Sequence, residues 1–285
     1  MTDLAATTLT DHSVFLKNFP MLIRLVRQSV RLLFPMACEG CAEPLGGDPI
    51  PFFCQDCWSL IRPFEGPSCP RCHRPFASSA ALIASPTHEC RQCRTCPPSY
   101  SQAWAPYPYC PPLQEAMALF KFRGKVGLAD ALGGLLIKAL PAGLVGDLVM
   151  PVPLHQNRLR SREFNQSLLL ADRVATHLRL PLDYRSLVRA RDTAPQTTLP
   201  RTARLDNMRR AFAVSRPTRV AGKQILLVDD VLTTGTTANA CAKVLRQAGA
   251  AGVTVLALAR SVDQGLIPDN RLPASAFNQT PLGDN

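Results

Sequence analysis

Four C-x2-C pairs constrain the fold of this chain more than any other feature of its sequence. The pairs are Cys38/Cys41, Cys54/Cys57, Cys69/Cys72 and Cys90/Cys93, separated by 12, 11 and 17 residues. A C-x2-C turn brings two thiolates onto one Zn²⁺, and two such turns complete a closed tetrahedral site with Zn–S bonds of about 2.3 Å, as in structural zinc centres. The eight cysteines therefore predict two structural zinc sites in a double zinc ribbon.

Other arrangements of these cysteines stay open. A disulfide framework needs an oxidising compartment, which nothing in the sequence supports, so zinc is favoured over disulfides. Sequential grouping, with the first two pairs on one ion and the last two on another, needs only short loops and is favoured over a cross-brace. Cys96 follows Cys93 at the same spacing, so the last C-x2-C pair could be Cys90/Cys93 or Cys93/Cys96. His73 or His88 could also replace a cysteine ligand.

The charges of the 285-residue chain are unevenly distributed. The chain carries 32 Lys and Arg against 21 Asp and Glu, but its first 110 residues hold 9 basic and 8 acidic side chains, so the excess lies in the remaining 175. Four thiolates around one divalent cation add a charge of about −2 per zinc site, which makes the cysteine module acidic. With 46% apolar and 19% charged residues, the composition excludes a disordered chain, a collagen and a coiled coil.

The segments on either side of the cysteine module have patterns of their own. Residues 21–34 combine an apolar helical face with an arginine face, which favours packing on the adjoining domain over peripheral membrane contact, although the latter stays open. Residues 95–114 carry no charge, but their prolines forbid a continuous helix, so we expect a semi-rigid connector. Because no secretion signal and no other apolar run of about 18 residues occurs, we expect a cytoplasmic protein without a transmembrane segment.

Residues 220–259 hold the most informative pattern of the basic half. An apolar run at 224–228 is typical of a buried strand that ends at Asp229, and a threonine-rich turn at 233–237 precedes an amphipathic helix. Cys241 lies on the apolar face of that helix and is predicted to be a core residue. A second buried strand follows, so the segment predicts a strand–loop–helix–strand crossover in a parallel sheet.

The loop of this crossover is suited to a phosphate. It lies where a strand's carboxyl end meets a helix amino terminus, whose unpaired N–H groups and dipole favour an anion. Gly235 lets the backbone close on the anion because it has no Cβ. A threonine N-cap on an ordinary helix would explain one threonine but not four with a glycine among them.

Asp229 and Asp230, directly before this loop, need a separate explanation. A carboxylate about 4 Å from a phosphate is repelled by roughly 4 kcal/mol at an effective dielectric constant near 20, so neither should face the phosphate. Vicinal hydroxyls, or a Mg²⁺ ion on a polyphosphate, would satisfy both carboxylates. A P-loop nucleoside triphosphatase is disfavoured, because neither Gly124-Lys125 nor Gly222-Lys223 is followed by Ser or Thr.

The stretch Ile-Leu-Leu-Val-Asp-Asp-Val-Leu-Thr-Thr-Gly-Thr-Thr, residues 225–237, resembles the phosphoribosyl-pyrophosphate (PRPP) binding motif of type I phosphoribosyltransferases. The resemblance implies that Asp229 and Asp230 are the catalytic pair that holds the ribose 2- and 3-hydroxyls. The residues implied in binding the phosphate are Val231, Leu232, Thr233, Thr234, Gly235, Thr236 and Thr237. The implied fold is α/β, a type I phosphoribosyltransferase-like parallel sheet with flanking helices, preceded by the double zinc-ribbon module.

From about residue 35 to 260 the chain is similar to one branch of that superfamily, the ComF-type proteins linked to DNA uptake in competent bacteria. Besides the cysteine pairs, the matching segments are 120–124, 151–155, 158–166, Arg191 with Thr193, Gln196 and Leu199, Arg204 with Asn207, and Ala211-Phe212. Family members usually have glycine where this chain has Glu163, which adds bulk and negative charge. The predicted limits are 1–34 for a leader, 35–96 for the ribbons, 97–114 for the connector, 115–262 for the phosphoribosyltransferase-like domain and 263–285 for a disordered tail.

Basic side chains complete the predicted site. Residues 147–152 form a predicted strand followed by an arginine-rich loop; if this strand adjoins the threonine loop, Lys121 and Arg162 are the pyrophosphate-side candidates. Residues 185–223 hold ten basic side chains against two aspartates around a predicted mobile loop, which could close over PRPP or follow a nucleic-acid backbone. The candidate nucleic-acid contacts are Arg201, Arg204, Arg209 and Arg210.

Two functions of different classes are consistent with these patterns. The first is a phosphoribosyltransferase that displaces pyrophosphate from PRPP, with Mg²⁺ offsetting the charge of the leaving group. The second is a protein that keeps the PRPP fold as a nucleotide sensor or scaffold, without turnover, and handles single-stranded DNA with the uptake machinery. Both imply structural Zn²⁺, and neither defines an acceptor substrate.

Overall fold

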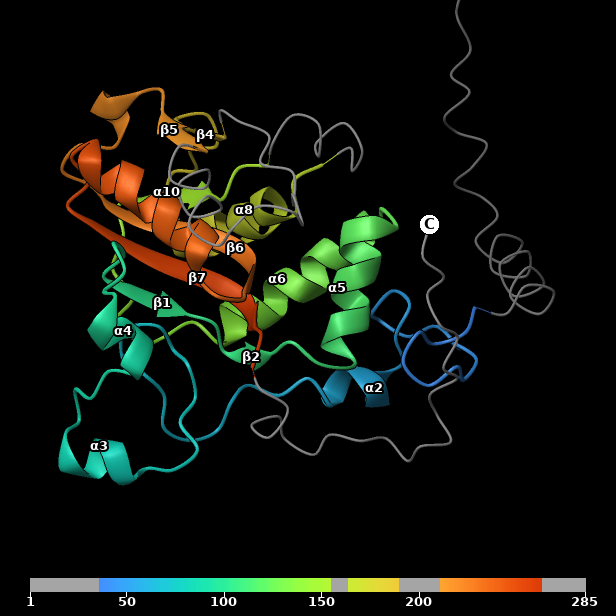
Figure 1. Cartoon of the computed structure of the whole chain (residues 1–285). Coiled ribbons are helices and arrows are strands. Elements are labelled where there is room, and N and C mark those ends of the chain that lie inside the picture. Colours follow the sequence, from blue (N-terminus) through green and yellow to red (C-terminus); the bar gives the residue numbers. More distant parts are fainter. Residues whose placement is uncertain (1–35, 155–163, 190–210, 263–285) are drawn as a thin grey trace, which may run out of the picture.

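The computed structural model of the chain describes residues 36–154, 164–189 and 211–262. Two small cysteine-rich units precede an α/β domain built around one parallel sheet (Figure 1). This architecture confirms the predicted fold class. The predicted leader and tail lie outside the described residues. Within the described ranges, no helix is both long and apolar enough to cross a membrane.

The two cysteine-rich units repeat one local structure, and we call them the first ribbon (residues 36–61) and the second ribbon (residues 67–96). In each, an isolated antiparallel bridge closes the first C-x2-C turn. The residue after that turn, Ala42 or His73, has a positive φ and donates its backbone N–H to the carbonyl of the first cysteine. A short helix then holds the second pair, α2 (Gln55–Ser59) in the first ribbon and α4 (Arg91–Thr95) in the second. The second ribbon also contains α3 (Ala80–Ala84).

The described strands of the central sheet all run parallel. They are β1 (Gln102–Trp104), β2 (Tyr107–Pro108), β3 (Leu148–Pro151), β6 (Gln224–Leu232) and β7 (Gly252–Arg260). Their order is β1-β7-β6-β3, and β2 also pairs with β7. β6 and β7 are long, largely buried strands, as expected for the centre of a sheet covered on both faces. Because β3 and β6 are neighbouring parallel strands, their carboxyl ends lie side by side.

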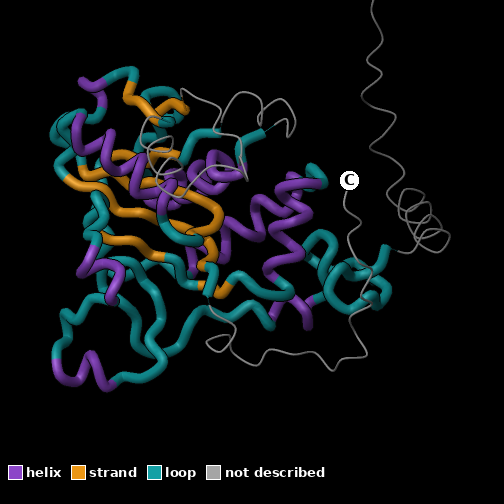
Figure 2. The backbone as a smooth tube through the Cα atoms, viewed as in Figure 1, coloured by secondary structure: helices purple, strands orange, loops and turns teal. Residues whose placement is uncertain are grey.

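Helices cover both faces of this sheet (Figure 2). α10 (Thr236–Gln247) packs on one face, whereas α5 (Leu113–Phe122), α6 (Ala129–Lys138) and α8 (Gln166–Leu178) pack on the other. The 3-10 turns η1 (Val126–Leu128) and η2 (Pro217–Arg219) lie between larger elements. β4 (Leu187–Arg189) and β5 (Phe212–Val214) form a separate antiparallel pair.

The two faces of the sheet have separate cores, and each ribbon joins one of them. On the α10 face, Ile225 and Leu227 share a core with the four ligand-type cysteines of the second ribbon. On the opposite face, Leu226 and Val228 share a core with α5, α6, α8 and Phe53 of the first ribbon. Figure 1 shows the first ribbon, in blue, beside α5 and the second ribbon, in teal, beside β1.

The predicted connector at 97–114 differs from the structure. Residues 102–108 supply the edge strands β1 and β2, and α5 begins within the same stretch. The prolines do not prevent this, because an edge strand needs hydrogen bonds on one side only. Ala103 and Tyr107 are buried next to β7. The burial of these two side chains offsets the cost of ordering the segment. The second ribbon is therefore joined directly to the sheet.

The strand before the phosphate loop also runs further than the sequence predicts. β6 continues through both aspartates to Leu232, which pairs with Arg260 of β7. The predicted crossover is otherwise present, since α10 follows Gly235 and ends before Gly249, which has a φ of +92°. Cys241 is fully buried on α10, as predicted for a core residue. The acidic pair therefore stands on a hydrogen-bonded strand and not in a loop.

Candidate functional site

The first ribbon gathers the sulfur atoms of Cys38, Cys41, Cys54 and Cys57 within 4.8 Å of one another. The Sγ atoms of Cys41 and Cys54 lie 3.7 Å apart. The backbone N–H groups of Gly40 and Cys54 donate to the Cys38 sulfur at 3.4 and 3.3 Å, which stabilises a thiolate there. A Cβ at Gly40 would lie 2.9 Å from the Cys57 sulfur, so the turn requires glycine.

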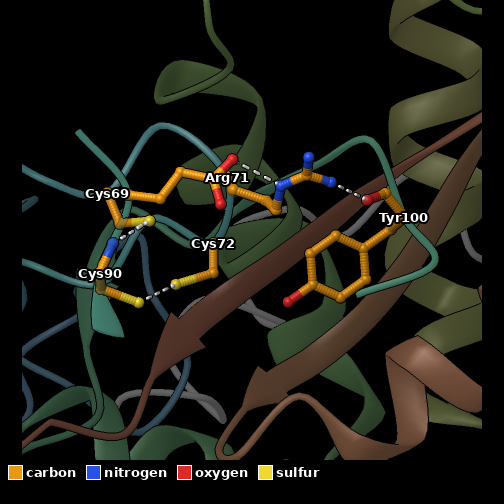
Figure 3. Close-up of polar contacts among 6 residues, drawn as sticks. Cys69, Arg71, Cys72, Cys90 and Tyr100 are labelled. Carbon is orange, nitrogen blue, oxygen red and sulfur yellow. Dashed lines mark hydrogen bonds and ion pairs between the residues drawn. The ribbon is translucent and has the colours of Figure 1, made fainter. Parts of the chain in front are cut away.

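The second ribbon gathers Cys69, Cys72, Cys90 and Cys93 in the same way, and all four are buried. Figure 3 shows Cys72 and Cys90 with their sulfurs facing, 3.7 Å apart, and the Cys90 N–H donating to the Cys69 sulfur at 3.3 Å. The buried Arg260 of β7 donates from Nη1 to the Cys72 carbonyl oxygen at 2.7 Å. A cationic side chain of the sheet thus lies against this cluster.

Both clusters fit zinc. A tetrahedral ion with Zn–S bonds of about 2.3 Å separates its sulfurs by about 3.8 Å, and the sulfur pairs at 3.7 Å in both ribbons match this distance. A disulfide needs an S–S distance of about 2.05 Å, and all the cysteines of the chain are free. The structure groups the pairs sequentially and not as a cross-brace.

The three other residues considered as zinc ligands lie outside the two clusters. Cys96 is exposed, and the His88 ring packs near that of Phe76. His73 is buried, and its Nδ1 lies 3.0 Å from the carbonyl oxygen of Ala105. His73 therefore connects the second ribbon to the segment between β1 and β2.

Asp229 and Asp230 contact the ends of two helices at the carboxyl end of β6. The Ser167 hydroxyl, in the first turn of α8, donates to Asp229 Oδ1 at 3.0 Å, and the Asp230 backbone N–H donates to the same oxygen at 2.9 Å. Lys121 of α5 forms an ion pair with Asp230, with Nζ 2.8 Å from Oδ2 and both side chains at most 15% exposed. Lys121, a pyrophosphate-side candidate from the sequence, thus lies at the acidic pair.

The Asp229 carboxyl has a pKa raised to about 7. Burial is the main cause and the neighbouring Asp230 adds to it, while the Asp230 N–H, the Lys121 cation and the Ser167 hydroxyl act in the opposite direction. At neutral pH this carboxyl therefore holds a proton in a substantial fraction of molecules. A cation at the pair would favour the ionised form and displace that proton.

The start of α8 positions Ser167. Asn165 Oδ1 accepts from the Ser167 backbone N–H at 3.0 Å as the N-cap, and its Nδ2 donates to the Val152 carbonyl oxygen at 3.1 Å. Gln166 Nε2 donates to the Lys121 carbonyl oxygen at 3.4 Å. The sequence analysis missed Ser167 at the acidic pair. The available signal was an Asn N-cap at the end of an arginine-rich loop, close to a predicted strand end.

The loop between β6 and α10 has the form of an anion-binding turn. Gly235 is the N-cap of α10 with a φ of +77°, a left-handed conformation that favours glycine. Glycine has no side chain that could cap the helix, although the Thr236 N–H donates to the Thr234 hydroxyl oxygen at a long 3.4 Å. Helix amino termini of this form are suited to an anion. The hydroxyls of Thr234 and Thr236 lie 2.8 Å apart. Thr233 and Thr234 are exposed, and Thr237 is half-buried.

The remaining predicted site residues divide into two groups. Val231 is half-buried and Leu232 is buried at the end of β6, so they anchor the loop to the sheet. The others lie outside the described residues. They are Glu163 and Arg162 of the arginine-rich loop, and Arg201, Arg204, Arg209 and Arg210 of the basic segment.

Two family models match this chain. The phosphoribosyl transferase domain matches residues 165–275, and the double zinc ribbon domain matches residues 29–96. Together with the parallel sheet and the two cysteine tetrads, these matches define the class: a double zinc ribbon joined to a phosphoribosyltransferase-like α/β domain.

Curated relatives narrow this class to a family. The chain is 34% identical over 200 residues to the DNA utilization protein YhgH of Escherichia coli, which spans 68% of this chain and 84% of the relative. It is 30% identical over 216 residues to competence protein F of Haemophilus influenzae, and the match covers 73% of this chain and 90% of the relative. It is 28% identical over 222 residues to competence protein ComFC of Bacillus subtilis, and the match covers 73% of this chain and 84% of the relative. The chain belongs to the ComF/YhgH family.

Proposed function

We propose that this protein binds PRPP together with Mg²⁺ and serves DNA uptake or utilisation in the cytoplasm. The observation that carries the proposal is the juxtaposition of a glycine-containing loop at a helix amino terminus with two carboxylates on the preceding strand. PRPP joins a 5-phosphate to vicinal hydroxyls and a pyrophosphate, so one ligand would satisfy both features. The names of the relatives, DNA utilization protein and competence protein, support the DNA-related role.

Within this proposal, each part of the site has a chemical task. The first-turn N–H groups of α10 and the threonine hydroxyls bind the 5-phosphate. Asp229 and Asp230 accept hydrogen bonds from the ribose hydroxyls, with Ser167 holding Asp229 in place. Lys121 balances Asp230 before the ligand binds and is within reach of the pyrophosphate side afterwards. Mg²⁺ would offset the pyrophosphate charge.

The test is calorimetric titration of PRPP with Mg²⁺ into the wild-type protein and a variant that combines Asp229→Ala with Asp230→Ala. We expect saturable binding by the wild type and a loss of about 100-fold or more in the variant, because several charge-assisted hydrogen bonds disappear. Zinc content measured on both samples controls for folding. Absence of wild-type binding, or equal binding by the variant, overturns the proposal.

A second candidate function is PRPP binding without turnover. Glu163 favours it, because its bulk and charge replace the glycine that family members usually have in a segment proposed to approach the pyrophosphate. Pyrophosphate release from bound PRPP, followed across candidate nucleobase and amine acceptors, distinguishes the two functions. Release with any acceptor establishes a transferase. Binding without release supports the second candidate, provided that the Glu163→Gly variant does release pyrophosphate.

The DNA-related part of the proposal can be tested on the excess of positive charge in residues 185–223. Single-strand affinity should fall steeply as salt rises, because binding to phosphates releases counterions. Charge reversal at Arg201 and Arg204, or at Arg209 and Arg210, should weaken binding further. An affinity that does not depend on salt argues against a surface that follows the DNA backbone.

A further inference from the structure

The second ribbon and the residues that follow it, 97–100, contact the phosphate loop and the first turn of α10. Gln92 Nε2 donates to the Thr234 carbonyl oxygen at 3.5 Å. The Ser99 backbone N–H donates to Asn239 Oδ1 at 2.6 Å. The Tyr100 hydroxyl lies 3.4 Å from the point that a Cβ of residue 235 would occupy. The loop–helix junction therefore accepts two hydrogen bonds from this side, and the Tyr100 hydroxyl lies next to Gly235.

The cysteine cluster fixes the residues that make these contacts. Gln92 lies inside the last C-x2-C pair, directly before the buried Cys93. Arg71, inside the preceding pair, donates from Nη1 to the Tyr100 carbonyl oxygen at 3.5 Å and from Nε to Glu89 Oε1 at 2.8 Å (Figure 3). The Ser101 backbone N–H donates to β7 at 2.8 Å. A zinc ion that orders the two pairs would thus order the contacts to the loop.

The loop itself benefits from such support. Thr233 and Thr234 are exposed, and Gly235 brings no side chain that could pack. An anion that binds an unsupported loop must order it, and this entropy cost reduces affinity, whereas a loop already held in the binding conformation avoids it. The cysteines of the second ribbon, Tyr100 and the buried residues of α10 belong to one core, so the support is continuous from the cluster to the loop.

We propose that the second ribbon is part of the phosphate site and that Gln92 and Tyr100 are positioning residues for the phosphate loop. The inference deepens the proposed function and rests on it. It predicts that zinc in the second tetrad and PRPP in the loop stabilise each other, because coupling between two binding sites is reciprocal.

The test compares Gln92→Ala with Asp56→Ala by titration with PRPP and Mg²⁺. Asp56 is the matched control, since it is also exposed and directly precedes the last cysteine of its tetrad, in the first ribbon. We expect Gln92→Ala to weaken PRPP binding about three- to tenfold and Asp56→Ala to leave it unchanged. Both variants should retain two zinc equivalents by elemental analysis. Equal affinities of the two variants overturn the inference while the proposed function stands, and absent wild-type binding overturns both.

Two further measurements separate positioning from general stability. Tyr100→Phe, which removes only the hydroxyl, should weaken PRPP binding about threefold without changing the zinc content. In the wild type, saturating PRPP and Mg²⁺ should slow the release of one zinc equivalent to a chromogenic chelator, and Gln92→Ala should reduce this protection. Zinc release that is indifferent to PRPP in the wild type contradicts the coupling, even if the affinity of the variants falls.

Discussion

The two ribbons share one local structure but are attached to the α/β domain in different ways. The first ribbon packs beside α5, where the Arg123–Glu39 ion pair spans 3.8 Å between side chains that are 59% and 39% exposed. The second ribbon is followed within a few residues by β1, and Arg260, a buried arginine of β7, donates to its Cys72 carbonyl oxygen. Both ribbons pack into a core of the sheet, but the charged contact of the first ribbon is exposed, whereas that of the second ribbon is buried.

This difference shows that what a metal module contributes depends on the element against which it packs. Each ribbon extends the core of one sheet face. The face of the second ribbon also carries α10 and the phosphate loop. The first ribbon packs beside α5, whose Lys121 pairs with Asp230, so its described link to the acidic pair is an indirect one. We therefore expect loss of the second ribbon to affect the phosphate loop and loss of the first to affect mainly stability.

The largest expected effect comes from matched cysteine replacements in the two ribbons. Cys72→Ser and Cys41→Ser each remove the second cysteine of the first C-x2-C turn, and each should lower the zinc content from two equivalents to one. Cys72→Ser should abolish measurable PRPP binding, because it disrupts the core that supports the loop, whereas Cys41→Ser should change the affinity less than about threefold. Calorimetry and elemental analysis on the same samples measure both effects. Equal losses in both variants would remove the distinction between the ribbons.

A smaller effect is expected from the arginines that attach the ribbons. Arg260→Met leaves the buried Cys72 carbonyl without its donor and should lower the free energy of unfolding by about 2 to 4 kcal/mol. Arg123→Met breaks only the exposed pair with Glu39 and should cost less than about 1 kcal/mol. Denaturant unfolding of both variants at one zinc concentration measures the difference. Similar costs for the two would show that the exposed ion pair stabilises the protein as much as the buried arginine does.

The pH dependence of PRPP binding tests whether α5, which lies between the first ribbon and the site, acts on the acidic pair through Lys121. The pKa of Asp229 is raised to about 7, so the ionised carboxylate that a ligand needs forms only as the pH rises through that value, and PRPP affinity should rise with it. Lys121→Met removes a cation that lowers this pKa, and the midpoint should move upward by about one pH unit. Calorimetric titrations between about pH 6 and 9 measure the midpoint. An unchanged midpoint would show that α5 does not act on the acidic pair.

The same carboxyl affects stability in the opposite direction. Because its pKa is higher in the folded than in the unfolded state, the folded protein binds this proton more tightly. The resulting stabilisation is complete below about pH 4 and is lost as the pH rises to about 7. Asp229→Asn should remove this contribution to the pH dependence of unfolding, which separates the protonation of Asp229 from any change in ligand binding.

Much of this architecture could be predicted from the sequence because its signals are local. The C-x2-C spacing determines the turns, and the strand–glycine–helix pattern around Gly235 determines the crossover. The edge strands at 102–108 were hidden, because their prolines resemble those of a connector and their burial depends on β7, far along the chain. For the same reason Ser167 could not be predicted at the acidic pair, and Lys121 was predicted near the pyrophosphate but not as the partner of Asp230, since no local pattern specifies which helix ends contact which strand.

The smallest expected effect concerns the first ribbon alone. Lys125 Nζ lies 5.1 Å from the centre of the Phe52 ring, a cation–π contact beside the exposed ion pair. Lys125→Gln keeps a long polar side chain and removes the charge, and it should lower the free energy of unfolding by about 0.5 to 1 kcal/mol. PRPP affinity should stay at the wild-type value, because this contact lies on the ribbon that does not touch the loop. If Lys125→Gln instead weakened PRPP binding as much as Gln92→Ala, the two ribbons would support the site equally, and the contrast between their cores would carry no functional meaning.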